Sequence, residues 1–267
     1  MGSCLSAVDD VVNDFIDQQS RYYQESKNAK SYAAKKNDNN TDTSSSHLSV
    51  VLKSDLSPIY PSLPKSAKKY HCRNVYDGDT LTLDDDSRVR LIGVDTPELK
   101  EKQPFAIEAK EYTKKYCHGR DIWLSFDSGD STTNKDHYGR LLGFIWVDLE
   151  GDARKSKNCT QWLCVNEGLV AAGLANVYSP SGSKKVNNYD KLLGLQTLAR
   201  EHKCGQWKSY KEQKVIVTPS GGAFHKCEDT NNVASDCKHL SRSKNLKLVD
   251  SSECYDKGMH PCRHCMS

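Results

Sequence analysis

Acidic and basic side chains gather in one short stretch of the chain, residues 74–98, which reads NVYDGDTLTLDDDSRVRLIGVDTPE. Asp79 and Asp95 flank a predicted hairpin, and neighbouring strands can bring two carboxylates to one cation. Carboxylate oxygens, with a backbone carbonyl and waters in the remaining positions, suit calcium and, less readily, magnesium. Asp77-Gly78 taken alone is typical of an ordinary turn. The cation site is therefore a hypothesis that depends on the residues around it.

Two arginines and a glutamate complete the outline of a phosphodiester site. Arg90 lies on the second strand of the predicted hairpin, and Arg140 lies in the segment DHYGRLLGF. A planar guanidinium group matches the geometry of phosphate oxygens. Glu98 is a candidate general base that takes a proton from water. Together these residue types predict metal-assisted hydrolysis of a phosphodiester.

Hydrophobic periodicity indicates the elements that must position these residues. Leu81 and Leu83 alternate with threonines, and the strand pattern resumes from Val89 to Val94. Further strands are predicted at DIWLSF and RLLGFIWVD. Helices are predicted at PFAIEAKEYTKKYC, CVNEGLVAAGLA and YDKLLGLQTLAREHKCG, the last ending at Gly205. Strands followed by helices predict an α+β arrangement, a small barrel capped by helices.

Composition limits the other possibilities. The 267 residues suffice for one substantial core and a small second unit, and no apolar run approaches the roughly 20 residues that span a bilayer. The net charge of +3 does not indicate a polyanionic partner, so nucleic-acid binding must depend on a local patch. Eleven cysteines without a secretory leader favour a reducing compartment.

Six segments together resemble the thermonuclease, or staphylococcal nuclease-like, family. In chain order they are VYDGDTLTL, RVRLIGVDTPE, EAKEYTKKY, DHYGRLLGFIWVD, VNEGLVAAGLANVY and LQTLAREHKCGQW. The resemblance implies an OB-type five-stranded barrel with appended helices. It also implies a calcium-dependent endonuclease that cuts DNA and RNA with little sequence preference, leaves 3′-phosphate products and uses no small-molecule cofactor. The alternative is a catalytically weak scaffold of the same fold that binds nucleic acid or protein.

The resemblance implies a calcium site in the acidic stretch. Asp79 and Asp95 would hold the metal, and the carbonyl oxygen of Thr96 would be a third ligand. Asp77 would form hydrogen bonds with the waters on the metal.

The resemblance also implies how the substrate is bound and cut. Glu98 would orient or deprotonate the attacking water, while Arg90 and Arg140 would bind the phosphate and stabilise the transition state. Tyr138 and His137 are expected to contact the substrate. His137 stands where the family has a lysine, so this contact is expected to be weaker or more sensitive to pH.

The last fifty residues carry a second set of candidate ligands, in SGGAFHKC, SDCKHL and MHPCRHC. Cys262-x-x-Cys265 has the spacing of zinc ligands, and a tetrahedral site needs two more donors. This tail resembles the Ada-like metal-binding module, which implies His225, Cys237, Cys262 and Cys265 as ligands. Cys227 remains an alternative to His225, and disulfides or free thiols remain an alternative to zinc.

The N-terminus predicts attachment to a membrane. MGSCLS fits the pattern for N-myristoylation of Gly2, and Cys4 is placed for a second acyl chain. The expected location is therefore the cytoplasmic face of a membrane, in particular the plasma membrane; the alternative is a disordered leader in a cytoplasmic protein. The predicted divisions are an amphipathic and basic segment (1–36), a linker (37–65), a nuclease-like domain (66–213) and a metal-binding module (214–267).

Overall fold

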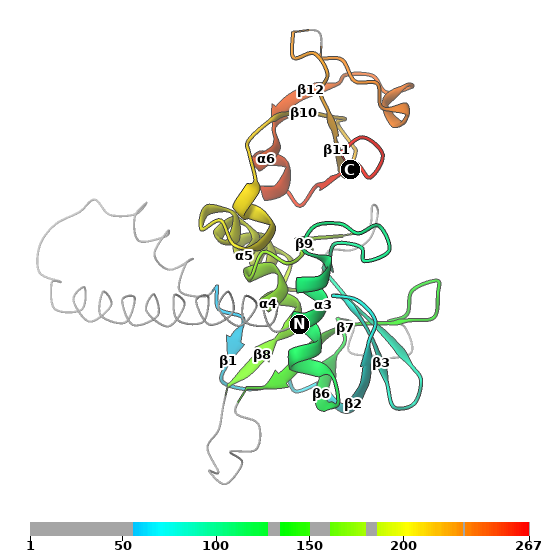
Figure 1. Cartoon of the computed structure of the whole chain (residues 1–267), viewed down its shortest axis with the longest axis vertical. Coiled ribbons are helices and arrows are strands. Elements are labelled where there is room, and N and C mark those ends of the chain that lie inside the picture. The colour runs from blue at the N-terminus through cyan, green and yellow to red at the C-terminus, as the bar shows by residue number, and fades with distance from the viewer. Residues whose placement is uncertain (1–55, 128–133, 150–160, 180–185, 232, 267) are drawn as a thin grey trace, which may run out of the picture.

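The computed structural model describes residues 56–127, 134–149, 161–179, 186–231 and 233–266 (Figure 1). The predicted acylation sites Gly2 and Cys4, with the whole segment 1–36, lie outside these ranges. None of the helices that the structure describes has the length and apolar composition of a bilayer-spanning segment.

Five strands close into a barrel. They are β2 (Lys68–Val75), β3 (Thr80–Leu83), β4 (Arg88–Leu91), β6 (Arg120–Ser125) and β7 (Leu141–Asp148). The strand order is β7-β4-β3-β2-β6, and pairing of β6 with β7 closes the ring. All pairs are antiparallel except β4 with β7. The predicted α+β fold with an OB-type barrel is confirmed.

Alternation along the strands fills the barrel. Leu81, Leu83, Val89 and Leu91 are each no more than 1% exposed, whereas Arg88 and Arg90 lie on the opposite face of β4. Three helices pack on this barrel: α3 (Ala106–Cys117), α4 (Val165–Ala171) and α5 (Tyr189–Glu201). Each lies within one of the three helical patterns of the sequence, and Figure 1 shows them beside the barrel.

The strand predicted from Val89 to Val94 is interrupted, and that part of the prediction is wrong. β4 ends at Leu91, and Gly93 has a φ of 81°, in the left-handed region that favours glycine. The chain then forms β5 (Val94–Asp95), which pairs with β9 (Asn176–Val177) outside the barrel sheet. Asp95 therefore leaves the barrel wall at a bend, and is not on a strand that neighbours Asp79.

The predicted end of the last helix is also wrong. α5 ends at Glu201, because Lys203 takes the left-handed conformation at a φ of 54°. The N–H groups of Lys203 and Cys204 then donate to the carbonyl groups of Arg200 and Ala199 at 3.1 and 2.8 Å. Gly205 begins the 3₁₀ helix η2 (Gly205–Ser209), where a Cβ would lie 2.4 Å from the carbonyl oxygen of Gly173. Close packing of two backbones, and not a helix end, requires this glycine.

A short strand before the barrel extends its sheet. β1 (Ile59–Tyr60) pairs with β8 (Trp162–Cys164), which in turn pairs with β7. The hydroxyl group of Tyr60 donates to the fully buried Glu167 at 2.7 Å. The sheet thus begins before residue 66, where the folded region was predicted to start.

The C-terminal residues form a second, smaller unit (Figure 1). Its sheet has the order β12-β10-β11-β13. The strands are β10 (Lys214–Val217), β11 (Ala223–Lys226), β12 (Lys247–Asp250) and β13 (His260–Pro261), with η3 (Lys238–Leu240) and α6 (Ser251–Asp256) between them. Two small apolar clusters stabilise the unit, one around Phe224 and Cys254 and the other around Ile216 and Cys237.

Candidate phosphodiester and metal sites

A guanidinium group joins the two predicted calcium ligands. Arg90 forms an ion pair with Asp79 through Nη1, and its Nη2 donates to Oδ1 of Asp95 at 2.8 Å. Asp79 lies immediately before β3 and is 5% exposed, whereas Asp95 is half-buried at the bend after Gly93. Residues 79, 90 and 95 thus meet at one point outside the barrel wall.

Thr96 fixes the carboxylate of Asp79. The backbone N–H and the hydroxyl group of Thr96 donate to Oδ2 of Asp79 at 2.8 and 2.9 Å. Burial raises the pKa of Asp79 to about 6, although the charge of Arg90 and the N–H of Thr96 act in the opposite direction. A buried, constrained carboxylate beside a second one is a site where a cation lowers the electrostatic energy.

The two donors of Thr96 are thus directed at Asp79, and the role of its carbonyl oxygen as a metal ligand stays a prediction. Asp77 accepts the backbone N–H of Asp79 at 3.2 Å, so the predicted turn is present beside the site. The carboxylates of Asp79 and Asp95 fit a hard cation such as calcium by donor type.

Gln103 holds the loop that carries Glu98. Its Oε1 accepts the N–H of Glu98 at 2.8 Å, and its own N–H donates to the carbonyl oxygen of Glu98 at 3.2 Å. Glu98 itself is half-buried. Gln103 has no signal in the sequence, because it lies beyond the acidic stretch and has no distinctive spacing.

Asp136 orients Arg140. Oδ2 of Asp136 accepts the Nε–H of Arg140 at 2.6 Å, and Oδ1 accepts the backbone N–H groups of Tyr138 and Arg140, each at 2.9 Å. Partial burial raises the pKa of Asp136, but these hydrogen bonds outweigh it and leave the pKa below its ordinary value. Arg140 directly precedes β7, whose Leu142 is opposite Arg90 on the neighbouring parallel strand β4.

Tyr138 and His137 lie on the turn before Arg140 and are both exposed, Tyr138 to 73%. Their ring centroids are 3.8 Å apart, and the guanidinium of Arg140 lies 5.4 Å from the Tyr138 ring. The turn thus presents two rings to solvent beside the predicted phosphate-binding arginine, where they can contact a substrate.

A second cluster forms in the C-terminal unit. One ligand atom from each of His225, Cys237, Cys262 and Cys265 lies within 4.8 Å of the other three. Nδ1 of His225 is 3.3 Å from Sγ of Cys237, and Sγ of Cys237 is 3.8 Å from Sγ of Cys262. Pairing of β11 with β13 places Cys262 beside His225, because the N–H of Cys262 donates to the carbonyl oxygen of Phe224. Cys227 is not a member of this cluster.

Neighbouring groups shift the pKa values of two thiols of this cluster in opposite directions. Burial raises the pKa of Cys262, but the backbone N–H groups of His264 and Cys265 outweigh it and the pKa is lowered. Burial and the neighbouring thiols raise the pKa of Cys265 to about 12. Three thiolates so close together repel one another, and a bound cation removes this repulsion. One nitrogen and three sulfur donors are a typical zinc set.

Arg263 connects the two units and was not identified from the sequence. Its Nη2 donates to Oδ2 of Asp95 at 3.1 Å, and its side chain is 66% exposed. The segment PCRHC predicts a metal-binding turn, but nothing in its spacing indicates that the arginine reaches a residue 168 positions away.

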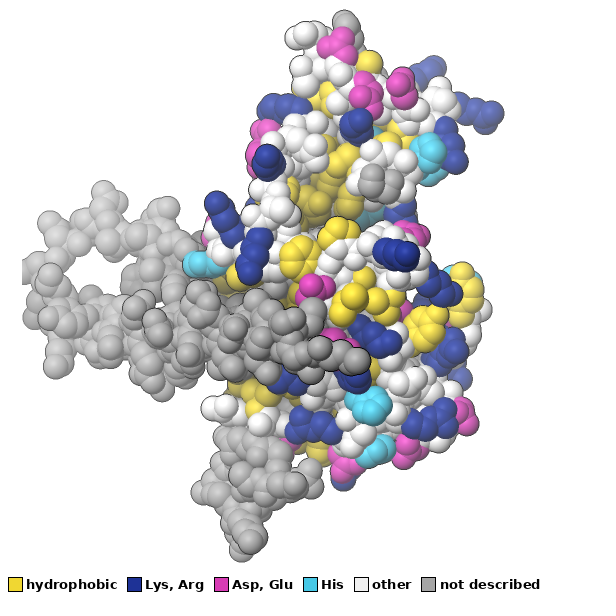
Figure 2. Space-filling view, viewed as in Figure 1, with side chains coloured by type: hydrophobic (Ala, Val, Ile, Leu, Met, Phe, Trp, Pro, Cys, Tyr) yellow, Lys and Arg dark blue, Asp and Glu magenta, His cyan; other side chains and the backbone are white. Residues whose placement is uncertain are grey.

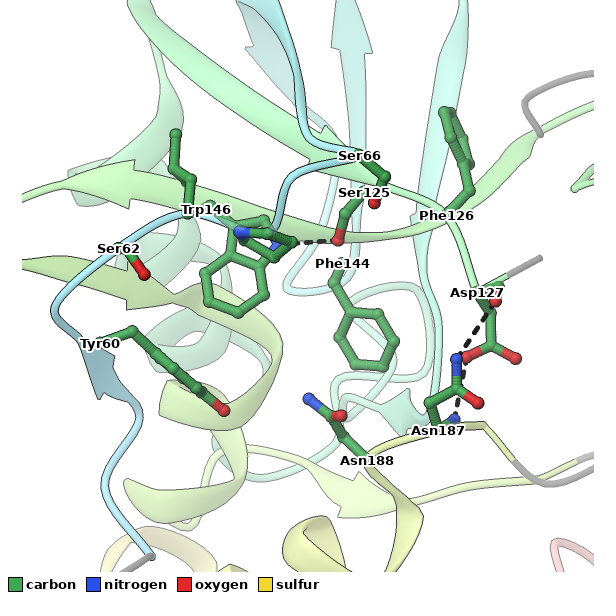
Figure 3. Close-up of a pocket in the computed structure, with 12 residues that line it drawn as sticks. Tyr60, Ser62, Ser66, Ser125, Phe126, Asp127, Phe144, Trp146, Asn187 and Asn188 are labelled. Atoms are coloured by element: carbon green, nitrogen blue, oxygen red, sulfur yellow. Dashed lines mark hydrogen bonds between the residues drawn. The ribbon is translucent and has the colours of Figure 1, made fainter. Parts of the chain in front are cut away.

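A hollow of about 370 Å³ lies elsewhere, between β1 and the segment after it, the end of β6, the middle of β7, and the residues just before α5 (Figure 3). Trp146 donates from Nε1 to Oγ of Ser125 at 2.8 Å within it. Of the residues that line the hollow, Asp127 is the one acid, and it accepts the backbone N–H of Asn187 at 2.9 Å. The hollow shares no lining residue with the predicted phosphodiester site.

Basic side chains do not form one continuous face in the view of Figure 2. Lys and Arg side chains are scattered over both units with Asp and Glu among them. This agrees with the small net charge of +3. On this face, basic side chains that could meet a phosphate chain are thus interspersed with acidic ones.

The fold is that of an α+β protein with a closed OB-type barrel, and Arg90 joins the carboxylates of Asp79 and Asp95 outside one wall of it. The family model described as "Staphylococcal nuclease homologue" matches residues 88–209, which include Arg90, Asp95, Glu98 and Arg140. The chain belongs to the staphylococcal nuclease family.

Named relatives agree with this assignment. The chain is 36% identical over 121 residues to a thermonuclease of Staphylococcus hyicus, which covers 42% of this chain and 62% of the relative. It is 31% identical over 127 residues to the probable endonuclease LCL3 of Pyricularia oryzae, covering 45% and 42%. It is 30% identical over 136 residues to Protein ParB of Escherichia coli, covering 50% and 68%. The chain thus matches less than two thirds of the length of the first two, and the family match does not extend to the C-terminal unit.

Proposed function

We propose that this protein is a calcium-dependent endonuclease that hydrolyses DNA and RNA with little sequence preference and leaves 3′-phosphate ends. The proposal rests mainly on one observation: Arg90 forms ion pairs with both Asp79 and Asp95. Its relatives named thermonuclease and endonuclease support the same reaction class.

Each residue has a distinct role in the proposed reaction. Asp79, Asp95 and the Thr96 carbonyl would hold a calcium ion, which when bound would supply Lewis-acid chemistry at the phosphoryl group. Glu98 takes a proton from the attacking water. Arg90 and Arg140 donate to the phosphoryl oxygens and stabilise the negative charge that grows on them, while the 5′ oxygen leaves.

The activity is tested with the purified full chain on supercoiled plasmid and on a single-stranded RNA, with calcium and with calcium chelated. We expect nicking and degradation of both substrates only with calcium, and 3′-phosphate ends on the products. A protein that binds DNA in the presence of calcium without cutting it would instead support the catalytically weak scaffold.

We also propose that His225, Cys237, Cys262 and Cys265 bind one zinc ion. The four ligand atoms within 4.8 Å of one another support this, and small units of this size usually depend on a metal for folding.

Zinc binding is tested by native mass spectrometry of a matched pair of variants. Cys237→Ser should lose the zinc ion, whereas Cys227→Ser should retain it, because only Cys237 belongs to the cluster. Removal of zinc should also open the C-terminal unit to proteolysis. Wild-type protein without zinc, with its thiols all open to alkylation, would contradict the proposal.

The proposed location is the cytoplasmic face of a membrane, in particular the plasma membrane, through acylation of Gly2 and Cys4; the MGSCLS motif supports it. One myristoyl chain binds membranes only marginally, so both sites should matter. In cell fractionation, Gly2→Ala should move the protein from the membrane pellet to the supernatant, and Cys4→Ser should do so in part. Wild-type protein wholly in the supernatant of cells that myristoylate other proteins would refute attachment.

A further inference from the structure

Asp95 lies between two arginines that come from the two units. Arg90 of the barrel donates to its Oδ1 at 2.8 Å, and Arg263 of the C-terminal unit donates to its Oδ2 at 3.1 Å. The acidic cluster of the predicted nuclease site is therefore completed on one side by a residue outside the family match at 88–209.

The backbone around Arg263 is held from both sides. Cys262 and Cys265, which flank it, belong to the Cys/His cluster, and the N–H groups of Cys265 and Met266 donate to the carbonyl oxygen of Cys262 at 3.3 and 2.9 Å. The N–H of Lys226 donates to Sγ of Cys265 at 3.4 Å. The turn that carries Arg263 is thus tied to β11 and to the proposed zinc site.

Docking of α6 against α5 fixes the C-terminal unit on the barrel. Thr197 and Arg200 of α5 donate to Oδ1 of Asp256 at 2.8 and 2.7 Å, and the buried Gln196 donates to the carbonyl oxygen of Tyr255 at 2.8 Å. The Tyr255 ring packs edge-on against Trp207 of η2, with centroids 4.8 Å apart. These contacts hold the turn with Arg263 against the barrel.

A further contact between the two units involves a residue of the strand just before Arg263. Tyr178, directly after β9, packs against His260 of β13 with ring centroids 5.7 Å apart. The guanidinium of Arg263 is charged, as arginine is in proteins generally, and it lies against the carboxylate of Asp95. A positive group at this position offsets the repulsion that the acids exert on a phosphate chain.

The exposure of Arg263 favours a role in binding. A guanidinium has five N–H donors, and with its side chain 66% exposed Arg263 keeps donors directed to solvent while one binds Asp95. Guanidinium donors match phosphate oxygens, and Asp95 positions this one where a nucleic-acid chain would approach the cation.

We propose that Arg263 is a phosphate-binding residue of the nuclease site, supplied by the C-terminal unit and positioned by its Cys/His cluster. This inference rests on the function proposed above, since it requires a phosphodiester chain at Asp95. The competing role is inhibition, called a block below: Arg263 pairs with the carboxylate of Asp95 and so weakens binding of the cation there.

The test measures binding of a fluorescein-labelled oligothymidylate to the zinc-loaded full chain, without added calcium, over a range of salt concentrations. One phosphate contact contributes about 0.7 to the slope of log affinity against log salt for a single strand. Arg263→Ala should therefore lower the slope by about 0.7 and weaken binding about fivefold at about 0.1 M salt. Arg242→Ala, at an exposed arginine of the same unit, is the matched control and should leave the slope unchanged.

One further variant, together with the Arg242→Ala control, separates the possible failures. Arg140→Ala reports on the nuclease site itself: a lower slope for Arg140→Ala but not for Arg263→Ala overturns the inference and leaves the proposed function standing. An unchanged slope in both variants overturns the inference and counts against the proposed function. If Arg242→Ala lowers the slope as much as Arg263→Ala, the effect is bulk charge and the inference is overturned.

Calcium affinity distinguishes binding from a block. By calorimetry, Arg263→Ala should change the calcium dissociation constant less than tenfold; a tighter calcium site together with faster cutting shows a block and overturns the inference.

Positioning of Arg263 by the Cys/His cluster is tested in a Cys237→Ser background. There, Arg263→Ala should have no further effect on the salt slope, and a full additional loss of about 0.7 would show that the cluster does not position the arginine.

Discussion

Replacement of Arg140 by alanine is expected to lower the rate of phosphodiester hydrolysis by about two to three decades. One preorganised donor to a developing charge is commonly worth about 3 to 4 kcal/mol of transition-state stabilisation. Asp136 already orients the guanidinium through Nε at 2.6 Å, and the N–H donors on Nη1 and Nη2 are suited to a phosphate. Initial rates on plasmid DNA at saturating calcium measure the effect.

Arg88→Ala is the matched control for this prediction. Arg88 lies on β4, two residues from Arg90, and is exposed. Like Arg140→Ala, the Arg88→Ala substitution removes one positive charge from this part of the surface. A general loss of attraction for DNA would therefore slow both variants alike. Equal losses would show that Arg140 acts through bulk charge, and thermal unfolding should show that both variants remain folded.

Lys191→Met is expected to destabilise the barrel by about 3 to 5 kcal/mol. Lys191 lies 2.9 Å from Oε2 of Glu167, a carboxylate with 0% exposure, and also donates to the carbonyl oxygen of Ser57 at 2.7 Å. The methionine would leave Glu167 buried with only the neutral donors of Tyr60 and Asn188. An uncompensated buried charge carries a penalty of this size. Urea unfolding followed by tryptophan fluorescence measures it.

Two variants make this prediction specific to the buried charge. Lys257→Met removes a lysine from the exposed pair with Glu253 and should change the free energy of unfolding by no more than about 1 kcal/mol. Adding Glu167→Gln to Lys191→Met removes the carboxylate charge and should recover part of the loss. No recovery in the double variant would mean that packing of the lysine stem, and not charge compensation, stabilises the barrel.

The barrel and its helices were predictable because their signals are local. Leu81, Leu83, Val89 and Leu91 follow the period of a strand, and the helical patterns near 106–117 and 189–201 follow the period of a helix. The end of α5 was not predictable in this way. A glycine near a helix end usually stops the helix, whereas here Lys203 takes the left-handed position. Gly205 is required by the backbone of Gly173, which approaches from a distant part of the chain.

The amino-acid sequence is enough to single out candidate residues for chemistry, because Asp79, Arg90 and Asp95 and the Cys262-x-x-Cys265 turn stand out by residue type, spacing and resemblance to a family. Which of these side chains meet depends on how the distant segments pack. The bend at Gly93 takes Asp95 out of the barrel wall, strand pairing places His225 rather than Cys227 in the Cys/His cluster, and docking of α6 on α5 brings Arg263 to Asp95. This is because the spacing of residues along the chain reflects only local strand and helix periods of a few residues. Contacts over 168 residues depend instead on which buried surfaces pack together.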